Sequence, residues 1–120
     1  MNIHMLPKWI KDLPDSDDKE VLTLLHKSSK KGISDPREIA FVINGITNKD
    51  DIDIITSYIN SAGWDHRITN PTKKYPNFQI EARKYNYIIE RSTLFEDQAF
   101  FQRLAETYKA VYDGWYASNN

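Results

Sequence analysis

Residues 37–46 are the segment that most restricts what this chain can fold into. Its apolar residues occupy both sets of alternating positions and are Ile39, Ala40, Phe41, Val42 and Ile43. Successive side chains of a strand point to opposite faces of a sheet, so a strand that is apolar at every position is buried on both faces. We therefore expect residues 37–46 to form a central β-strand around which the other elements pack.

Two helices are predicted on either side of this strand. Residues 15–31 begin with residue types that favour a helix N-cap and end at Gly32, a common C-terminal stop. After the strand, Thr47 is the expected N-cap of a second helix, which ends at Gly63. Its inner face is formed by apolar residues at helical spacing, namely Ile52, Ile55, Ile59 and Ala62, with Tyr58 at the edge.

A third helix is predicted in the second half of the chain. Thr93 and Glu96 have the spacing of a capping box, in which each side chain bonds the other residue's backbone N–H. The residues expected to line the inner face are Phe95, Ala99, Phe100, Leu104 and Tyr108, with Phe101 beside them.

Three further strands complete the prediction. Residues 64–68 form a short strand, and residues 78–83 alternate cleanly as another. The alternation slips near Lys84, which indicates either a bulge or the end of the strand. The last strand contains Tyr112, Trp115 and Tyr116, and we expect it to kink at Gly114, where no Cβ restricts the backbone.

The element order is one helix followed by β-α-β-β-α-β. Two βαβ halves with right-handed crossovers predict an α+β fold, a ferredoxin-like sandwich with a four-stranded antiparallel sheet. The extra N-terminal helix is expected at an edge of the sheet or beside the helical layer. We predict that residues 1–14 form an N-terminal arm and that residues 15–120 form a single domain. The arm's apolar residues, Leu6, Trp9, Ile10 and Leu13, suit a short docked turn, although an exposed Trp9 would suit a partner.

Composition excludes several classes of protein. The chain has no cysteine, which excludes disulfides, thiol catalysis and zinc–thiolate sites. No apolar run approaches the roughly 20 residues that a membrane span needs, and no secretion signal is visible. A formal net charge of −1 gives no electrostatic reason for general nucleic-acid binding. We expect a soluble cytoplasmic protein, either a monomer or a homodimer.

Patterns that carry catalysis or cofactor binding are not found. His4, His26 and His66 lie on different elements without ligand spacing, so neither a metal nor a cofactor is predicted. Acidic residues at 50, 51 and 53 fall in the first turns of a helix, where they stabilise the helix dipole. No glycine-rich phosphate loop or nucleophile motif is present, so we expect a protein that is not an enzyme.

A basic and aromatic region in the second half of the chain raises the alternative of RNA binding. Its residues are Arg67, Lys73, Lys74, Arg83 and Lys84, with Tyr75, Tyr85 and Tyr87 nearby. The aromatic positions of an RNA-recognition sheet are not matched. We therefore expect a protein partner, with nucleic acid unlikely.

Short motifs resemble one known family. Residues 34–39, Ser-Asp-Pro-Arg-Glu-Ile, lead into the central strand, and Tyr112-Asp113-Gly114-Trp115 lies in the last strand. Between them, residues 62–64 are Ala-Gly-Trp, where a helix passes into a strand. This pattern resembles the ribonuclease E inhibitor family, also called regulator of ribonuclease activity B, over about residues 17–118. The resemblance implies a small non-enzymatic cytoplasmic protein with a ferredoxin-like core that inhibits ribonuclease E by binding it.

Two functions follow as hypotheses. The first is a protein-binding regulator of an RNA-processing enzyme such as ribonuclease E, and the alternative is an immunity protein that neutralises a cognate toxin. Aromatic and arginine side chains supply much of the energy of protein interfaces, so we expect Trp115 and Tyr116, with Trp64 or Arg67 on a neighbouring strand, to contact the partner. For the tryptophans, packing in the core is an equal alternative. Asp113 is expected to accept backbone hydrogen bonds in a turn.

Overall fold

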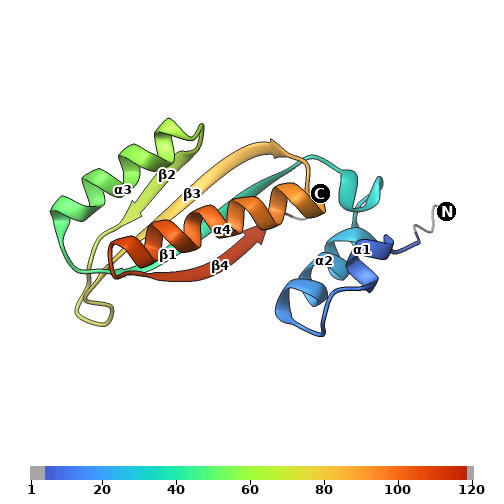
Figure 1. Cartoon of the computed structure of the whole chain (residues 1–120), viewed down its shortest axis with the longest axis horizontal. Helices are drawn as coiled ribbons and strands as arrows, with labels where there is room; N and C mark the ends of the chain where they lie inside the picture. The colour runs from blue at the N-terminus through green and yellow to red at the C-terminus, as the bar shows by residue number, and fades with distance from the viewer. Residues whose placement is uncertain (1–4, 119–120) are drawn as a thin grey trace.

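The computed structural model describes residues 5–118 and has the predicted ferredoxin-like α+β architecture (Figure 1). The four strands are β1 (Arg37–Ile46), β2 (Asp65–Thr69), β3 (Phe78–Tyr87) and β4 (Val111–Ala117). They pair antiparallel in the order β2-β3-β1-β4, so β1 is a central strand as predicted. Helices α3 (Lys49–Ser61) and α4 (Arg91–Thr107) cover one face of the sheet (Figure 1).

Helix α3 begins one residue later than predicted, and α4 begins three residues earlier. Helix α3 is capped by Asn48, whose side chain accepts the backbone N–H of Asp50 at 2.9 Å, and not by Thr47. Helix α4 begins at Arg91 without a side-chain cap, so the predicted capping box of Thr93 and Glu96 is wrong. The buried face of α4 is formed by Leu94, Phe101, Leu104 and Ala105. Of the predicted inner face, Phe95, Ala99, Phe100 and Tyr108 are only half-buried.

The slip of alternation in β3 is a bulge, and the strand continues through it. Ile39 pairs with Lys84 and Arg37 pairs with Tyr87, so β3 has one residue more than β1 between these pairs. Asn86 lies in the left-handed region with a φ of 54°, a conformation that asparagine tolerates better than most residues. The extra residue returns Tyr87 to the buried side of the sheet.

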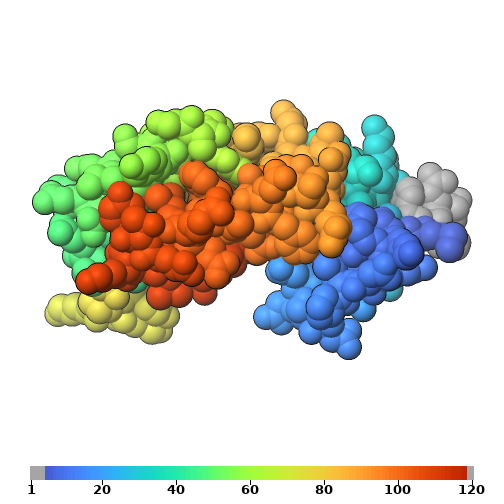
Figure 2. All heavy atoms as spheres, in the orientation of Figure 1, coloured from blue at the N-terminus to red at the C-terminus, as the bar shows by residue number. Residues whose placement is uncertain are grey.

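The N-terminal helices lie beyond one end of the sheet. We use the name N-terminal lobe for residues 5–34, which contain α1 (Lys8–Lys11), α2 (Asp17–Ser28) and the 3-10 helix η1 (Gly32–Ser34). Figures 1 and 2 show this lobe, coloured from blue to cyan, beyond the end of the layer that α3 and α4 form. Ile10 and Leu22 join the core cluster, so α1, within the predicted arm, packs on the body.

Arg37 connects the N-terminal lobe to the sheet. Its side chain is buried, with 2% of its surface exposed. The guanidinium donates to Ser29 Oγ at 2.9 Å and to the carbonyls of Gly32, Asp35 and Ser118 at 3.0 to 3.3 Å. Burial lowers the pKa of Arg37, and the nearby Asp35 opposes this shift. One cation therefore holds the end of α2, η1 and the end of β4 together.

Candidate functional site

The four residues predicted to contact a partner do not gather in one place. Strands β2 and β4 are the two outer strands of the sheet, so Arg67 and Tyr116 lie on opposite edges and not on neighbouring strands. Trp115 pairs with Phe41, whose ring stacks on Phe101 of α4, and it therefore lies on the helix-covered face. Tyr116 pairs with Ala40 and lies on the other face.

Trp64 is a core residue, with 4% of its surface exposed. Its ring meets Phe41 and Phe101 edge to face, with centroids 5.3 Å and 5.1 Å apart. The Lys84 ammonium lies 4.7 Å from the ring centroid and covers its outer side. The expectation of an interface role for Trp64 therefore does not fit its position, because a partner cannot reach this side chain in the folded chain.

The Tyr112–Trp115 motif contains the predicted kink of β4. Phe41 pairs with Trp115 and Ile43 with Tyr112, so β4 carries one extra residue between these pairs. Gly114 has a φ of 85°, in the left-handed region where a Cβ is unfavourable. The bulge lets Tyr112 and Trp115, an odd number of residues apart, both point toward the helices.

These two side chains end in a hydrogen-bond network that we call the Asp18 clamp, formed by Asp18, Gln98, Tyr112 and Trp115. Trp115 Nε1 donates to Asp18 Oδ1 at 3.1 Å, and Gln98 Nε2 donates to Asp18 Oδ2 at 3.3 Å. The Tyr112 hydroxyl donates to Gln98 Oε1 at 3.0 Å. Burial, followed by the Asp18 charge, raises the pKa of Tyr112. The clamp fastens α2 to α4 and β4, which gives the motif a structural role.

Asp113 faces away from the clamp. Its Oδ2 accepts the side-chain N–H of Asn44 at 2.7 Å, in place of the backbone hydrogen bonds expected from sequence. The contact joins β4 to β1 at the exposed end of the sheet.

Arg67 and Tyr116 approach the same residue from the two edges of the uncovered face. Arg67 is the direct cross-strand neighbour of Glu81, and the Tyr116 hydroxyl donates to Glu81 Oε2 at 3.0 Å. Glu38 and Arg83 form an ion pair on the same face. We call Glu38, Arg67, Glu81, Arg83 and Tyr116 the open-face cluster. Ala40 is buried although no helix of residues 5–118 covers it, because Arg83 and Tyr116 flank it on either side.

The open-face cluster has the composition of a protein-binding surface. Tyr116 is 49% exposed and is held in position by its bond to Glu81. Burial and the bond to Glu81 raise the pKa of Tyr116, so it remains a neutral donor at physiological pH. An ordered tyrosine beside two arginines provides the residue types that are enriched at interface hot spots. Sequence gave no signal for Glu81 beyond the polar alternation of β3.

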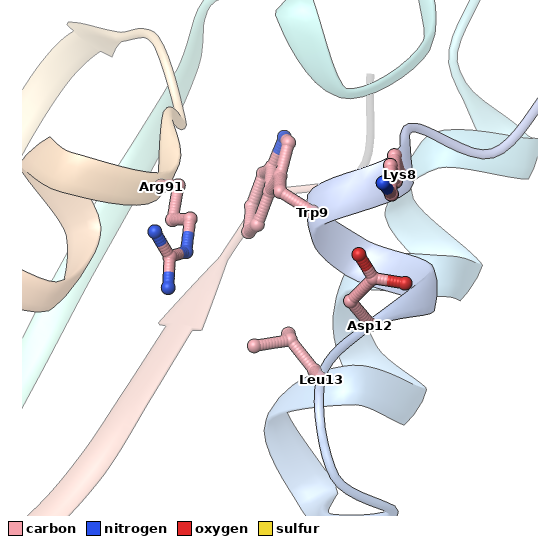
Figure 3. A pocket seen from close by; sticks show the side chains of 5 residues that line it. All are labelled: Lys8, Trp9, Asp12, Leu13 and Arg91. Atoms are coloured by element: carbon pink, nitrogen blue, oxygen red, sulfur yellow. The ribbon is translucent and has the colours of Figure 1, made fainter.

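A cleft of about 460 Å³ separates α1 from the start of α4 (Figure 3). Lys8, Trp9, Asp12 and Leu13 line one side and Arg91 lines the other. Trp9 packs partly against the core, and its ring faces Arg91 across the cleft (Figure 3). Trp9 is therefore docked on the body and also accessible from the cleft. The cleft is lined by charged side chains of both signs, so its charge favours neither an anionic nor a cationic ligand.

The histidines have structural contacts. His26 Nδ1 accepts the backbone N–H of Ile33 at 2.9 Å, so its Nε2 carries the proton and donates to the Met5 carbonyl at 3.0 Å. His66 Nδ1 lies 2.9 Å from Asn60 Oδ1, and His4 falls outside the described residues. Among residues 5–118, no group of His, Cys, Asp or Glu side chains is placed to hold a metal ion. No helix in this part of the chain is long and apolar enough to cross a membrane.

The sequence matches the model of one known protein family over most of its length. The model of one protein family, described as regulator of ribonuclease activity B, matches residues 15–116. The match covers β1, both sandwich helices and nearly all of β4, together with α2. No curated protein matches the sequence. Neither comparison supports the immunity-protein alternative.

Proposed function

The chain belongs to the regulator of ribonuclease activity B family, and from this premise we propose that it is a non-catalytic protein that binds ribonuclease E and lowers its activity. It acts in the cytoplasm, where it meets its target. The family match carries this proposal. The open-face cluster is the surface through which the contact is made.

The arrangement of the open face supports a protein partner. Tyr116 and Arg67 stand on either side of Glu81, so a partner that covers them buries an aromatic ring and a cation together. Glu38 and Glu81 interrupt the positive charge of Arg67 and Arg83, so this face offers no continuous path for a phosphodiester backbone. Mixed charges of this kind set orientation and partner choice at protein interfaces.

The experiment is a cleavage assay with purified ribonuclease E, a labelled RNA substrate and the full chain. The wild-type protein lowers the initial cleavage rate, and Tyr116→Ala raises the concentration needed for half inhibition by about 5- to 30-fold, the effect of losing an interface hot spot. Arg67→Ala acts in the same direction. Both side chains lie on the surface, so both variants are expected to fold.

Tyr58→Ala is the matched control, because Tyr58 is a similarly exposed tyrosine on α3, across the molecule from the open face. It leaves inhibition unchanged. The proposal fails if the wild-type chain neither binds nor inhibits ribonuclease E. The assignment of the open face fails if Tyr58→Ala weakens inhibition as much as Tyr116→Ala.

A further inference from the structure

The loop between β2 and β3 closes a cavity at the end of the sheet farthest from the N-terminal lobe. Residues 70–77 form this loop, which projects from the body in yellow in Figures 1 and 2. The cavity has a volume of about 470 Å³ and lies between the loop, the end of β1 and the start of β4. That volume is within the range of small-ligand sites, about 300–1,000 Å³. We refer to it as the loop cavity.

The lining of the loop cavity is rich in groups that both donate and accept hydrogen bonds. Asn70, Asn77 and Gln79 contribute side-chain amides, and Tyr75 contributes an aromatic ring. Among the described residues that line it, Asp113 alone is charged, and one of its oxygens is occupied by Asn44. Amide side chains pair with the donor and acceptor edges of nucleobases, and a carboxylate accepts from an exocyclic amine. Lys73 and Lys74 adjoin the cavity in the sequence of the loop but do not belong to the described lining, which suits a neutral base inside and phosphates outside.

Tyr75 is positioned before any ligand arrives. It is 67% exposed, yet its backbone is fixed, because its N–H donates to Thr72 Oγ1 at 3.1 Å and its carbonyl accepts the Thr72 N–H at 2.8 Å. The Lys74 ammonium lies 5.5 Å from the ring centroid. A turn whose backbone is already ordered loses little backbone freedom when a ligand stacks on the ring that it carries.

We propose that the loop cavity binds one nucleobase of single-stranded RNA, which stacks on Tyr75 while Lys73 and Lys74 contact the flanking phosphates. This inference goes beyond the proposed function and does not rest on it. The net charge of the whole chain gave no reason to expect general nucleic-acid binding. Two adjacent lysines beside an aromatic ring form a local site, which the net charge of the whole chain does not describe. Glu81 in the neighbouring part of the open face limits the contact to a few nucleotides.

The test is a titration of the isotope-labelled full chain with a single-stranded trinucleotide, followed by the backbone and side-chain amide signals. Saturable shifts are expected in residues 70–77 and in the side-chain amide of Gln79. Tyr75→Ala weakens binding about tenfold because it removes the ring on which the base stacks, and Tyr75→Phe retains binding because it keeps that ring. Tyr85→Ala is the control, because Tyr85 is also exposed, at 60%, but does not line the cavity.

Two further titrations show whether the site binds a free nucleoside or a base within an RNA strand, and whether the lysines contribute. A mononucleoside binds more weakly than the trinucleotide because it lacks the phosphates that reach Lys73 and Lys74. Replacing both lysines by Gln weakens trinucleotide binding and flattens its dependence on salt. No saturable shift in the loop, equal binding of the mononucleoside, or an equal loss in Tyr85→Ala would each overturn the proposal. Inhibition of ribonuclease E by Tyr75→Ala is measured separately, because that assay reports on the open-face cluster and not on the loop cavity.

Discussion

Replacing Trp64 by Ala tests most directly how the core is built, because the sequence left open whether this side chain packs in the core or contacts a partner. Truncating a buried aromatic residue to Ala costs about 3–5 kcal/mol. Trp64 also makes edge-to-face contacts with Phe41 and Phe101, and such pairs contribute about 0.5–1.5 kcal/mol beyond their buried area. The expected loss therefore lies in the upper part of the range, about 4–5 kcal/mol.

Thermal unfolding followed by circular dichroism measures this loss. For a chain of 120 residues, a change of 1 kcal/mol shifts the Tm by about 4 °C, so Trp64→Ala lowers the Tm by roughly 15–20 °C. Trp64→Phe keeps a ring in the cavity and loses about half as much. If Trp64→Ala melts within about 5 °C of the wild type and fails only to bind its partner, the core assignment is refuted.

Three further predictions concern stability. Arg37→Ala removes a cation that four buried or half-buried acceptors share, so the free energy of unfolding falls by about 3 kcal/mol in urea denaturation; a loss below about 1 kcal/mol would contradict its connecting role. Gly114→Ala costs about 1–2 kcal/mol from backbone strain alone, since within residues 5–118 no atom beyond the two chain neighbours lies within 4 Å of the added Cβ, and an unchanged urea midpoint would argue against the bulge. Burial is the largest cause that raises the pKa of Tyr87 and of Tyr112 above the usual value of about 10, so the folded chain retains protons that the unfolded chain releases. The free energy of unfolding that depends on these two tyrosines is therefore complete below a pH of about 10 and falls as the pH rises further. Tyr112→Phe should make this free energy fall less steeply with pH, and a slope identical to that of the wild type would contradict the prediction.

Local patterns predicted the elements of the sheet well. Residues 37–46 form β1 with the expected bounds, because apolar residues on both faces leave few alternatives to a buried strand. The kink at Gly114 and the slip near Lys84 were visible because a glycine between aromatic residues and a change of parity are both local signals. Each proved to be a bulge of one residue.

Contacts between distant segments were beyond the reach of these patterns. Trp64 stands one residue before an exposed strand, and only the packing of α4 over β1 shows that its ring faces inward. An acidic residue at the start of a helix stabilises the helix dipole, and this local role is enough to explain Asp18 in the sequence. Nothing in the sequence therefore indicated that Asp18 accepts a hydrogen bond from Trp115, 97 residues away. The order of strands likewise placed Arg67 and Tyr116 on opposite edges, yet on one face around Glu81.

Site-specific photocrosslinking tests the central claim, that ribonuclease E binds the open-face cluster. A photoreactive phenylalanine analogue is placed at Tyr116 in one variant and at Tyr58 in the other, and each is irradiated with purified ribonuclease E. A crosslinked complex is expected from position 116 and none from position 58. A crosslink from position 58 alone would contradict it and would move the binding surface to the helical face.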